Sequence, residues 1–350
     1  MIRNLLLAAA ATLIALLLGE AAVRLIRPQI FPVHPPGMYV ADPNVGYALA
    51  PGFQGRLERA EFSAPFSVGP SGLRGEDGDR DRAALRILAL GDSQTFGFGV
   101  RDGETYAAVL ERLLRERTGR PVEVLNAGVP GYGTADQRNF LVSRWEALRP
   151  DIVILQFLPV NDFVESRYPA VDWAAIVDGR LGNRANAPAA DPTLFQRLRR
   201  WQKRHSHLAT LLSENLGYLA MRMGLMHGGA GLLGEDFTPE DAARVEGLLA
   251  EIADFARARG APTMLLYATS KADVIGGRYE PRPSRDAIAV AADAAGIPWT
   301  DANTFLRAHP DRLETYWRLD GHWTAVGHRA IAELLAHELE RRRWLDARRP

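Results

Sequence analysis

The chain has 350 residues, of which 47% are hydrophobic and 24% are charged, a composition typical of a folded globular protein. Its 42 basic and 42 acidic residues give a formal net charge of zero, and this balance disfavours a nucleic-acid-binding protein, which usually carries a basic excess. The chain contains no cysteine, so a cysteine nucleophile, a disulfide framework and a cysteine-ligated zinc or iron–sulfur site are excluded.

The first 27 residues predict a helix that anchors the chain in a membrane. Arg3 precedes residues 5–19, which carry no charge, and the apolar pattern continues to Ile26, which is long enough to span a bilayer. Gly19-Glu20-Ala21 weakly matches a cleavage site, so a cleaved signal peptide is the alternative to the signal anchor that we favour. Either interpretation leaves the positive N-terminus in the cytoplasm. We therefore expect a single-pass protein of the cell membrane whose main domain lies on the periplasmic or extracellular side.

Residues 28–83 are rich in proline and glycine, which disfavours helices. We expect a small, irregular, membrane-proximal segment here. Within it, residues 60–68 are compatible with a strand, residues 69–72 with a turn, and the charged run 74–82 with a solvated loop.

From residue 84 onwards, short apolar runs alternate with helical patterns. The expected strands cover residues 85–90, 122–125, 151–156, 263–267 and 297–300. The expected helices cover residues 105–117, 135–148, 239–258, 284–295 and 325–342. This alternation predicts an α/β fold, a three-layer α/β/α sandwich around a five-stranded parallel sheet that occupies residues 84–345.

An interval at about residues 163–238 interrupts this alternation. It contains the basic run 197–204, an apolar stretch over residues 208–226 and a glycine-rich end at 228–234. Such an insertion could act as a lid or lie on a lipid interface. We favour a helical elaboration packed on the sheet, because basic amphipathic patterns are common in ordinary surface helices.

Polar motifs follow three of the predicted strands and precede the last helix. They are Gly91-Asp92-Ser93, the glycine-rich stretch 126–133, Asn161-Asp162 and Asp320-Gly321-His322. Each motif alone is explained as a turn or a helix cap. Because the carboxyl ends of parallel strands meet at one edge of a sheet, the four together predict one shared site.

These motifs resemble the four sequence blocks of the SGNH (GDSL-type) hydrolases, and the N-terminal anchor with its proline-rich lead resembles the membrane-tethered bacterial members. The resemblance covers about residues 84–343 and implies a flavodoxin-like sandwich. It also implies that Ser93 is the nucleophile, that Gly131 and Asn161 belong to the oxyanion hole, and that Asp320 and His322 supply the acid and the base.

One position departs from the family pattern. The usual acid lies three residues before the histidine, where this chain has Leu319, whereas Asp320 lies only two residues before His322. Glu314 or a backbone carbonyl is the alternative partner for the imidazole. The shorter Asp-x-His-Trp version resembles anchored members and polysaccharide O-acetyltransferases.

The same residues suit nucleophilic catalysis on chemical grounds. A serine hydroxyl needs a base to accept its proton, and His322 can serve while Asp320 orients its ring. The anionic intermediate needs fixed donors, for which the Ser93 N–H, the Gly131 N–H and the Asn161 amide are candidates.

We therefore expect a serine ester hydrolase of the esterase, lipase or deacetylase type, acting on an acyl ester of a lipid or an acylated glycan. The alternatives are an O-acyltransferase that modifies an envelope polysaccharide and a catalytically silent glycan-binding relative. No metal or cofactor is expected, because no histidine–carboxylate spacing matches a metal site, and His328 and His337 are expected to be core or solvated residues. Trp323 is equally compatible with a pocket wall and with the core.

Overall fold

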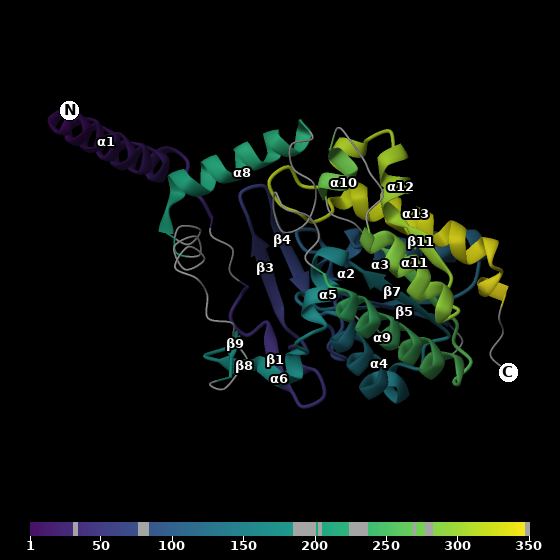
Figure 1. Cartoon of the computed structure of the whole chain (residues 1–350). Helices are drawn as coiled ribbons and strands as arrows, with labels where there is room; N and C mark the ends of the chain where they lie inside the picture. Colours follow the sequence, from purple (N-terminus) through teal and green to yellow (C-terminus); the bar gives the residue numbers. More distant parts are fainter. Residues whose placement is uncertain are drawn as a thin grey trace.

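The structure is a computed structural model that describes residues 1–30, 34–75, 84–184, 201, 205–223, 237–268, 271–276 and 283–346. Its centre is a parallel sheet covered by helices on both faces, which makes it a three-layer α/β/α sandwich (Figure 1). The fold class predicted from the sequence is confirmed.

The central sheet has five parallel strands in the order β11-β10-β7-β5-β6. Their bounds are β5 (Leu85–Gly91), β6 (Val122–Gly128), β7 (Ile152–Phe157), β10 (Thr263–Tyr267) and β11 (Trp299–Asp301). Counted along the chain, this is the 2-1-3-4-5 order of flavodoxin-like sheets. The strands β5, β7 and β10 are buried at every position, because helices cover both of their faces.

Six main helices form the two outer layers. One face of the sheet carries α4 (Thr134–Leu148), α9 (Pro239–Arg257) and α11 (Pro283–Ala294), and the other carries α3 (Tyr106–Thr118), α12 (Ala302–Ala308) and α13 (Ala325–Arg341). The five predicted helices agree with these bounds to within one residue at each end. Local signals explain that accuracy: α9, for example, begins where Thr238 and Asp241 cap each other around Pro239.

Two antiparallel hairpins precede the sandwich. They consist of β1 (Tyr39–Asp42) with β2 (Gly46–Leu49), and β3 (Gln54–Glu58) with β4 (Ser63–Ser67). The predicted strand at 60–68 and the turn at 69–72 are present, but the rest of the segment is more regular than its proline content suggests. Its apolar side chains join the main core, and the buried Tyr47 hydroxyl donates a hydrogen bond to the Pro130 carbonyl at 2.8 Å.

Arg74 corrects the prediction of a solvated loop over residues 74–82. Its side chain is buried, and it donates hydrogen bonds to the carbonyl oxygens of Phe96 (3.1 Å) and Val100 (3.0 Å). It also forms an ion pair with Asp102. The rest of that charged run, from residue 76, lies outside the described residues. Arg74, the first residue of the charged run, therefore connects the hairpins to the loop after Ser93.

The N-terminal helix α1 (Ile2–Ile26) is long and apolar enough to cross a membrane by length and composition, and none of its residues is buried. Its C-terminal end lies beside the start of α8 (His207–Arg222), which runs from there along the sandwich towards α10 (Lys271–Ile275) (Figure 1). The glycine-rich end at 228–234 and most of the basic run 197–204 lie outside the described residues.

The remaining elements are short. They are α2 (Ser93–Phe96), α5 (Pro159–Glu165), α6 (Ala170–Trp173), β8 (Ala174–Val177), β9 (Arg180–Asn183) and the 3-10 helices η1 (Asp102–Glu104), η2 (Arg312–Glu314) and η3 (Trp344–Asp346).

Candidate active site

Ser93 lies at the carboxyl end of the central strand β5, where α2 begins. The preceding residue, Asp92, is fully buried and caps this helix, because its Oδ1 accepts a hydrogen bond from the Gln94 N–H at 2.8 Å. The strand order reverses between β5 and β7, and open parallel sheets bind ligands beyond such a point. Ser93 therefore lies where folds of this class bind their ligands, and its side chain is partly exposed.

His322 reaches Ser93 from the opposite end of the domain. Its Nε2 lies 2.8 Å from Ser93 Oγ, and its Nδ1 lies 2.5 Å from Asp320 Oδ1. The same Asp320 oxygen accepts the backbone N–H of His322 at 2.9 Å. A spacing of two residues therefore suffices, because the carboxylate folds back onto both the backbone and the ring of His322. Asp320, and not Glu314, contacts the imidazole.

Ionisation of Asp320 is favoured by its surroundings. Burial alone would raise the pKa of Asp320, but the proximity of His322, its two hydrogen bonds and the charge of Arg59 hold that pKa below its ordinary value. The Arg59 Nε lies 3.9 Å from Asp320 Oδ2. An ionised carboxylate is the form that can accept a hydrogen bond from the N–H of the imidazole.

Gln94 joins the serine turn to the histidine loop. Its side-chain Nε2 donates to the Gly321 carbonyl at 3.1 Å, and its Oε1 accepts the Trp323 N–H at 3.2 Å. These two bonds flank His322 and fix its backbone relative to α2. The Trp323 side chain is fully buried in the core beneath this loop, which decides between the two roles considered for it.

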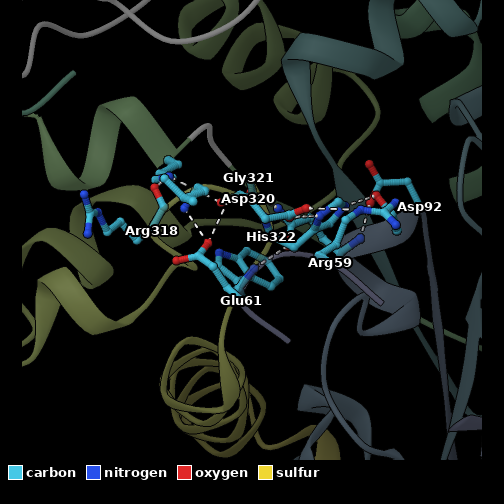
Figure 2. Close-up of polar contacts among 12 residues, drawn as sticks. Arg59, Glu61, Asp92, Arg318, Asp320, Gly321 and His322 are labelled. Carbon is cyan, nitrogen blue, oxygen red and sulfur yellow. Dashed lines mark hydrogen bonds and ion pairs between the residues drawn. The ribbon is translucent and has the colours of Figure 1, made fainter. Parts of the chain in front are cut away.

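Glu61, on the turn between β3 and β4, also holds this loop (Figure 2). Its Oε2 accepts the N–H groups of Leu319 at 2.5 Å and Asp320 at 3.2 Å. Lys271 on α10 adds a third support, since its ammonium donates to the carbonyl oxygens of Arg318 and Asp320. Burial lowers the pKa of Lys271 to about 8, although Glu61 and Asp320 oppose that shift.

An aromatic and a cationic side chain from the N-terminal half complete the surroundings of the imidazole. The Phe98 ring stacks on the His322 ring with centroids 4.6 Å apart and planes at 29°. The Arg59 guanidinium lies 4.9 Å from the centre of the Phe98 ring. Sequence reasoning missed Arg59, Glu61, Phe98 and Lys271, because none of them belongs to a local motif.

Asn161, on α5 after strand β7, lies next to Asp92. One hydrogen of its amide Nδ2 is directed to Asp92 Oδ2 at 3.3 Å, which leaves the second for another acceptor. The following Asp162 is fully buried and fixes the turn, accepting from the Leu158 N–H at 2.6 Å and the Thr134 hydroxyl at 3.0 Å. The Asn161 amide is therefore held at the same edge of the sheet as Ser93.

Gly131 lies on the loop after β6 with φ +87°, a conformation that favours glycine. A Cβ at this position would lie 2.8 Å from the Tyr47 hydroxyl, so a side chain has no room. Within the described part of the chain, no hydrogen bond joins Gly131 to Ser93 or Asn161. The structure thus accounts for a glycine here by its backbone conformation and its contact with Tyr47.

Glu165 is an additional acidic group that the sequence did not single out. It lies four residues after Asn161 on α5 and therefore on the same side of that helix. Burial, together with the nearby Asp92 and Asp136, raises the pKa of Glu165 to about 8. These surroundings therefore favour the neutral form of the Glu165 carboxyl.

The other sequence candidates have structural roles where they are described. His328 is fully buried and accepts the Tyr106 N–H at 3.1 Å, so the expectation of a core histidine is confirmed for this residue. Within the residues that the structure describes, no three histidine, aspartate or glutamate side chains gather as metal ligands would. A groove of about 470 Å³ lies beside the histidine loop between Phe62 and Trp317, but neither Ser93 nor His322 lines it.

Comparison with known proteins identifies the family of this chain. The model of the GDSL-like Lipase/Acylhydrolase family matches residues 89–330. No curated protein matches the chain significantly. Solved structures that resemble it include a lipase/acylhydrolase from Enterococcus faecalis (15% identity, 73% of this chain and 96% of that chain, TM-score 0.41). A second is TesA (17% identity, 73% of this chain and 97% of that chain, TM-score 0.39). A third is the esterase EstA from Pseudoalteromonas sp. (13% identity, 75% of this chain and 100% of that chain, TM-score 0.40). Because the family match spans more than half of its length, the chain belongs to the GDSL-like lipase/acylhydrolases, a family of ester-bond hydrolases.

Proposed function

We propose that the protein hydrolyses an acyl ester through a covalent acyl-serine, with Ser93 as nucleophile, His322 as base and Asp320 as its partner. The observation that carries this proposal is the continuous contact Ser93 Oγ–His322 Nε2–Asp320 Oδ1, at 2.8 Å and 2.5 Å. The Nδ1–H of His322 donates to Asp320, which leaves Nε2 free to accept the hydroxyl proton.

The reaction proceeds in two transfers. As Ser93 Oγ forms a bond to the carbonyl carbon, its proton passes to His322 Nε2, and the bond to the leaving alcohol then breaks as His322 protonates that oxygen. Water repeats the sequence on the acyl-serine, with His322 again as the base, and releases the acid. Asp320 remains ionised throughout and stabilises the imidazolium.

The developing oxyanion needs fixed donors, and we assign the role to the Ser93 N–H, the Gly131 N–H and the Asn161 amide. Two features support this assignment. Ser93 is the first residue of α2, where backbone N–H groups are free of helical partners. Asn161 has one amide hydrogen left after its bond to Asp92.

We further propose that α1 remains attached as a membrane anchor and that the catalytic domain lies on the periplasmic or extracellular side. Glu20, near the end of α1, accepts hydrogen bonds from Ser206, His207 and Leu208 at the start of α8. Removal of α1 by a signal peptidase would leave those groups without this partner, which supports a retained helix.

The full-length protein in detergent tests the catalytic assignment. We expect wild type to react with a fluorophosphonate probe and to cleave short-chain p-nitrophenyl esters. Ser93→Ala should lose the label and about 10³-fold or more in kcat, the scale seen when a triad member is removed. The matched control is Ser143→Ala on α4, whose hydroxyl donates to the Asn139 and Phe140 carbonyl oxygens of its own helix. Retained labelling and turnover in Ser93→Ala would reject the assignment.

A further inference from the structure

The anchor helix and α8 form a well-defined joint. The Glu20 carboxylate accepts the Ser206 hydroxyl at 2.9 Å, the His207 N–H at 3.0 Å and the Leu208 N–H at 2.9 Å. Arg24 binds Glu20 at 2.7 Å and also donates to the His205 carbonyl at 2.7 Å. Two of the N–H groups that a helix leaves unpaired at its start, those of His207 and Leu208, are therefore satisfied here by α1.

Apolar contact and a backbone bond reinforce this joint. Leu208 Cδ2 lies 3.0 Å from the position that a Cβ on Gly19 would occupy, so the two helices meet closely at this glycine. Just beyond α1, the Gln29 N–H donates to His207 Nδ1 at 2.7 Å. The first turn of α8 is thus held at the end of the membrane-spanning helix.

The helix α8 has two different faces. Tyr218 and Met221 pack against the core cluster under α3 and α13. The opposite face carries an apolar stripe, which we define as Leu212, Leu216, Leu219 and Met223. These residues are spaced by four, three and four positions, so they line one side of the helix. Their side chains are 48–61% exposed, and they are the surface left open by the packing of α8.

The chain just before α8 has the composition of a lipid-facing segment. Residues 197–204 contain five basic residues and no acidic one. Trp201, within that run, is 59% exposed and stacks on His205 at 5.1 Å. Basic residues, an exposed tryptophan and an apolar stripe are the features of helices that bind a bilayer surface.

We propose that the apolar stripe of α8 binds the surface of the lipid bilayer that α1 enters. The proposal rests on the retention of α1 proposed above. We choose a bilayer as the partner because the joint holds the stripe near the membrane. The stripe begins one helical turn beyond Leu208, and Leu208 contacts α1.

This surface lies one helix away from the catalytic loop. At the edge of the stripe, Asn215 Oδ1 accepts a hydrogen bond from Arg318 at 3.0 Å. The Tyr218 ring lies 5.1 Å from the Arg318 guanidinium and 5.4 Å from the Lys271 ammonium. Lipid contact with the stripe therefore places the loop that carries Asp320 and His322 next to esters held in the same bilayer.

Because the chain has no cysteine, single cysteines in the full-length protein can report this contact. Leu212→Cys and Leu216→Cys are labelled with an environment-sensitive fluorophore and reconstituted in phosphatidylcholine–phosphatidylglycerol vesicles. The matched control is Val290→Cys on α11, which is 65% exposed on the outer layer of the sandwich. Lipids that carry a nitroxide just below the headgroup act as quenchers. We expect roughly twofold or greater quenching of both stripe probes relative to Val290, because interfacial helices bury their apolar face about 5–10 Å deep.

Two outcomes would overturn the proposal. Stripe probes as weakly quenched as the Val290 probe would show that the stripe faces water. A blue-shifted emission without lipid quenching would show that protein, such as a second copy, covers it. Ester hydrolysis and fluorophosphonate labelling are measured on the same vesicles, and carbonate extraction tests whether α1 is embedded. Failure of the lipid contact is thereby distinguished from failure of the proposed catalysis or anchoring.

Discussion

Glu61 offers a direct test of how the shortened Asp-x-His loop is held. One of its oxygens accepts two consecutive N–H groups, those of Leu319 and Asp320, across a sequence separation of more than 250 residues. We therefore expect Glu61→Ala to release the backbone that carries Asp320, while the side chains of Ser93, His322 and Asp320 remain unchanged.

The expected magnitude follows from those two bonds. Hydrogen bonds to a charged group contribute about 1.5–3 kcal/mol each, but water can reach this half-buried loop and replace part of the loss. We expect the free energy of unfolding to fall by about 2 kcal/mol. A displacement of about 1 Å in a reacting group costs on the order of 10²-fold in rate, so kcat should fall by about that factor, with a smaller change in KM.

The assay compares Glu61→Ala and Glu61→Gln with Glu58→Gln, an exposed glutamate on the same hairpin. Steady-state hydrolysis of a p-nitrophenyl ester gives kcat and KM, and titration with a fluorophosphonate gives the fraction of active sites. Glu61→Gln keeps one acceptor oxygen and should recover part of the loss. If kcat per titrated site stays within twofold of wild type in Glu61→Ala, Glu61 acts on folding alone and the positioning argument is refuted.

Three further changes test the site. Asn161→Ala removes a proposed oxyanion donor and should lower kcat about 10²-fold with little effect on KM, and an unchanged kcat would move that role to another group. Gly131→Ala forces a Cβ to 2.8 Å from the Tyr47 hydroxyl at φ +87°, and we expect a loss of about 1–3 kcal/mol in unfolding free energy, measured by chemical denaturation. Glu165→Gln tests the raised pKa of about 8. A carboxyl whose pKa is higher in the folded state makes the fold less stable as the pH rises from its ordinary pKa of 4.5 through 8. The free energy of unfolding then falls by at most about 5 kcal/mol, and Gln, which does not titrate, avoids this loss. The Tm of the variant minus that of wild type should therefore increase from pH 6 to pH 9. A difference in Tm that stays constant across that range would contradict the assignment.

The sequence predicted the sandwich well because its signals are local. The inner strands β5, β7 and β10 are short, largely apolar runs, and the helices begin at recognisable caps such as Thr238 with Asp241. The motifs that contain Ser93 and Asn161 follow β5 and β7 directly in the sequence, so the position of each motif is set by the strand before it. Their convergence followed from the geometry of a parallel sheet.

The supports of the site could not be predicted in the same way. Glu61 and Arg59 lie in a proline- and glycine-rich segment whose composition indicates only turns, and their partners are on a loop more than 250 residues later. Arg74 was misjudged because its neighbours in the charged run are polar, whereas its own N–H donates to the Asn126 carbonyl and draws it into the interior. Such contacts depend on the tertiary arrangement, which a pattern of residue types does not encode.

The distance along the chain between Ser93 and His322 has a consequence for biosynthesis. The two residues are 229 positions apart, and the strand that precedes Ser93 is the first of the central sheet, whereas His322 arrives after the last. If the proposed roles of the two residues are correct, a growing polypeptide carries its nucleophile long before it carries the base, and the site is complete only after the last strand of the sheet has been made. A product that terminates before residue 322 would then lack the proposed proton acceptor.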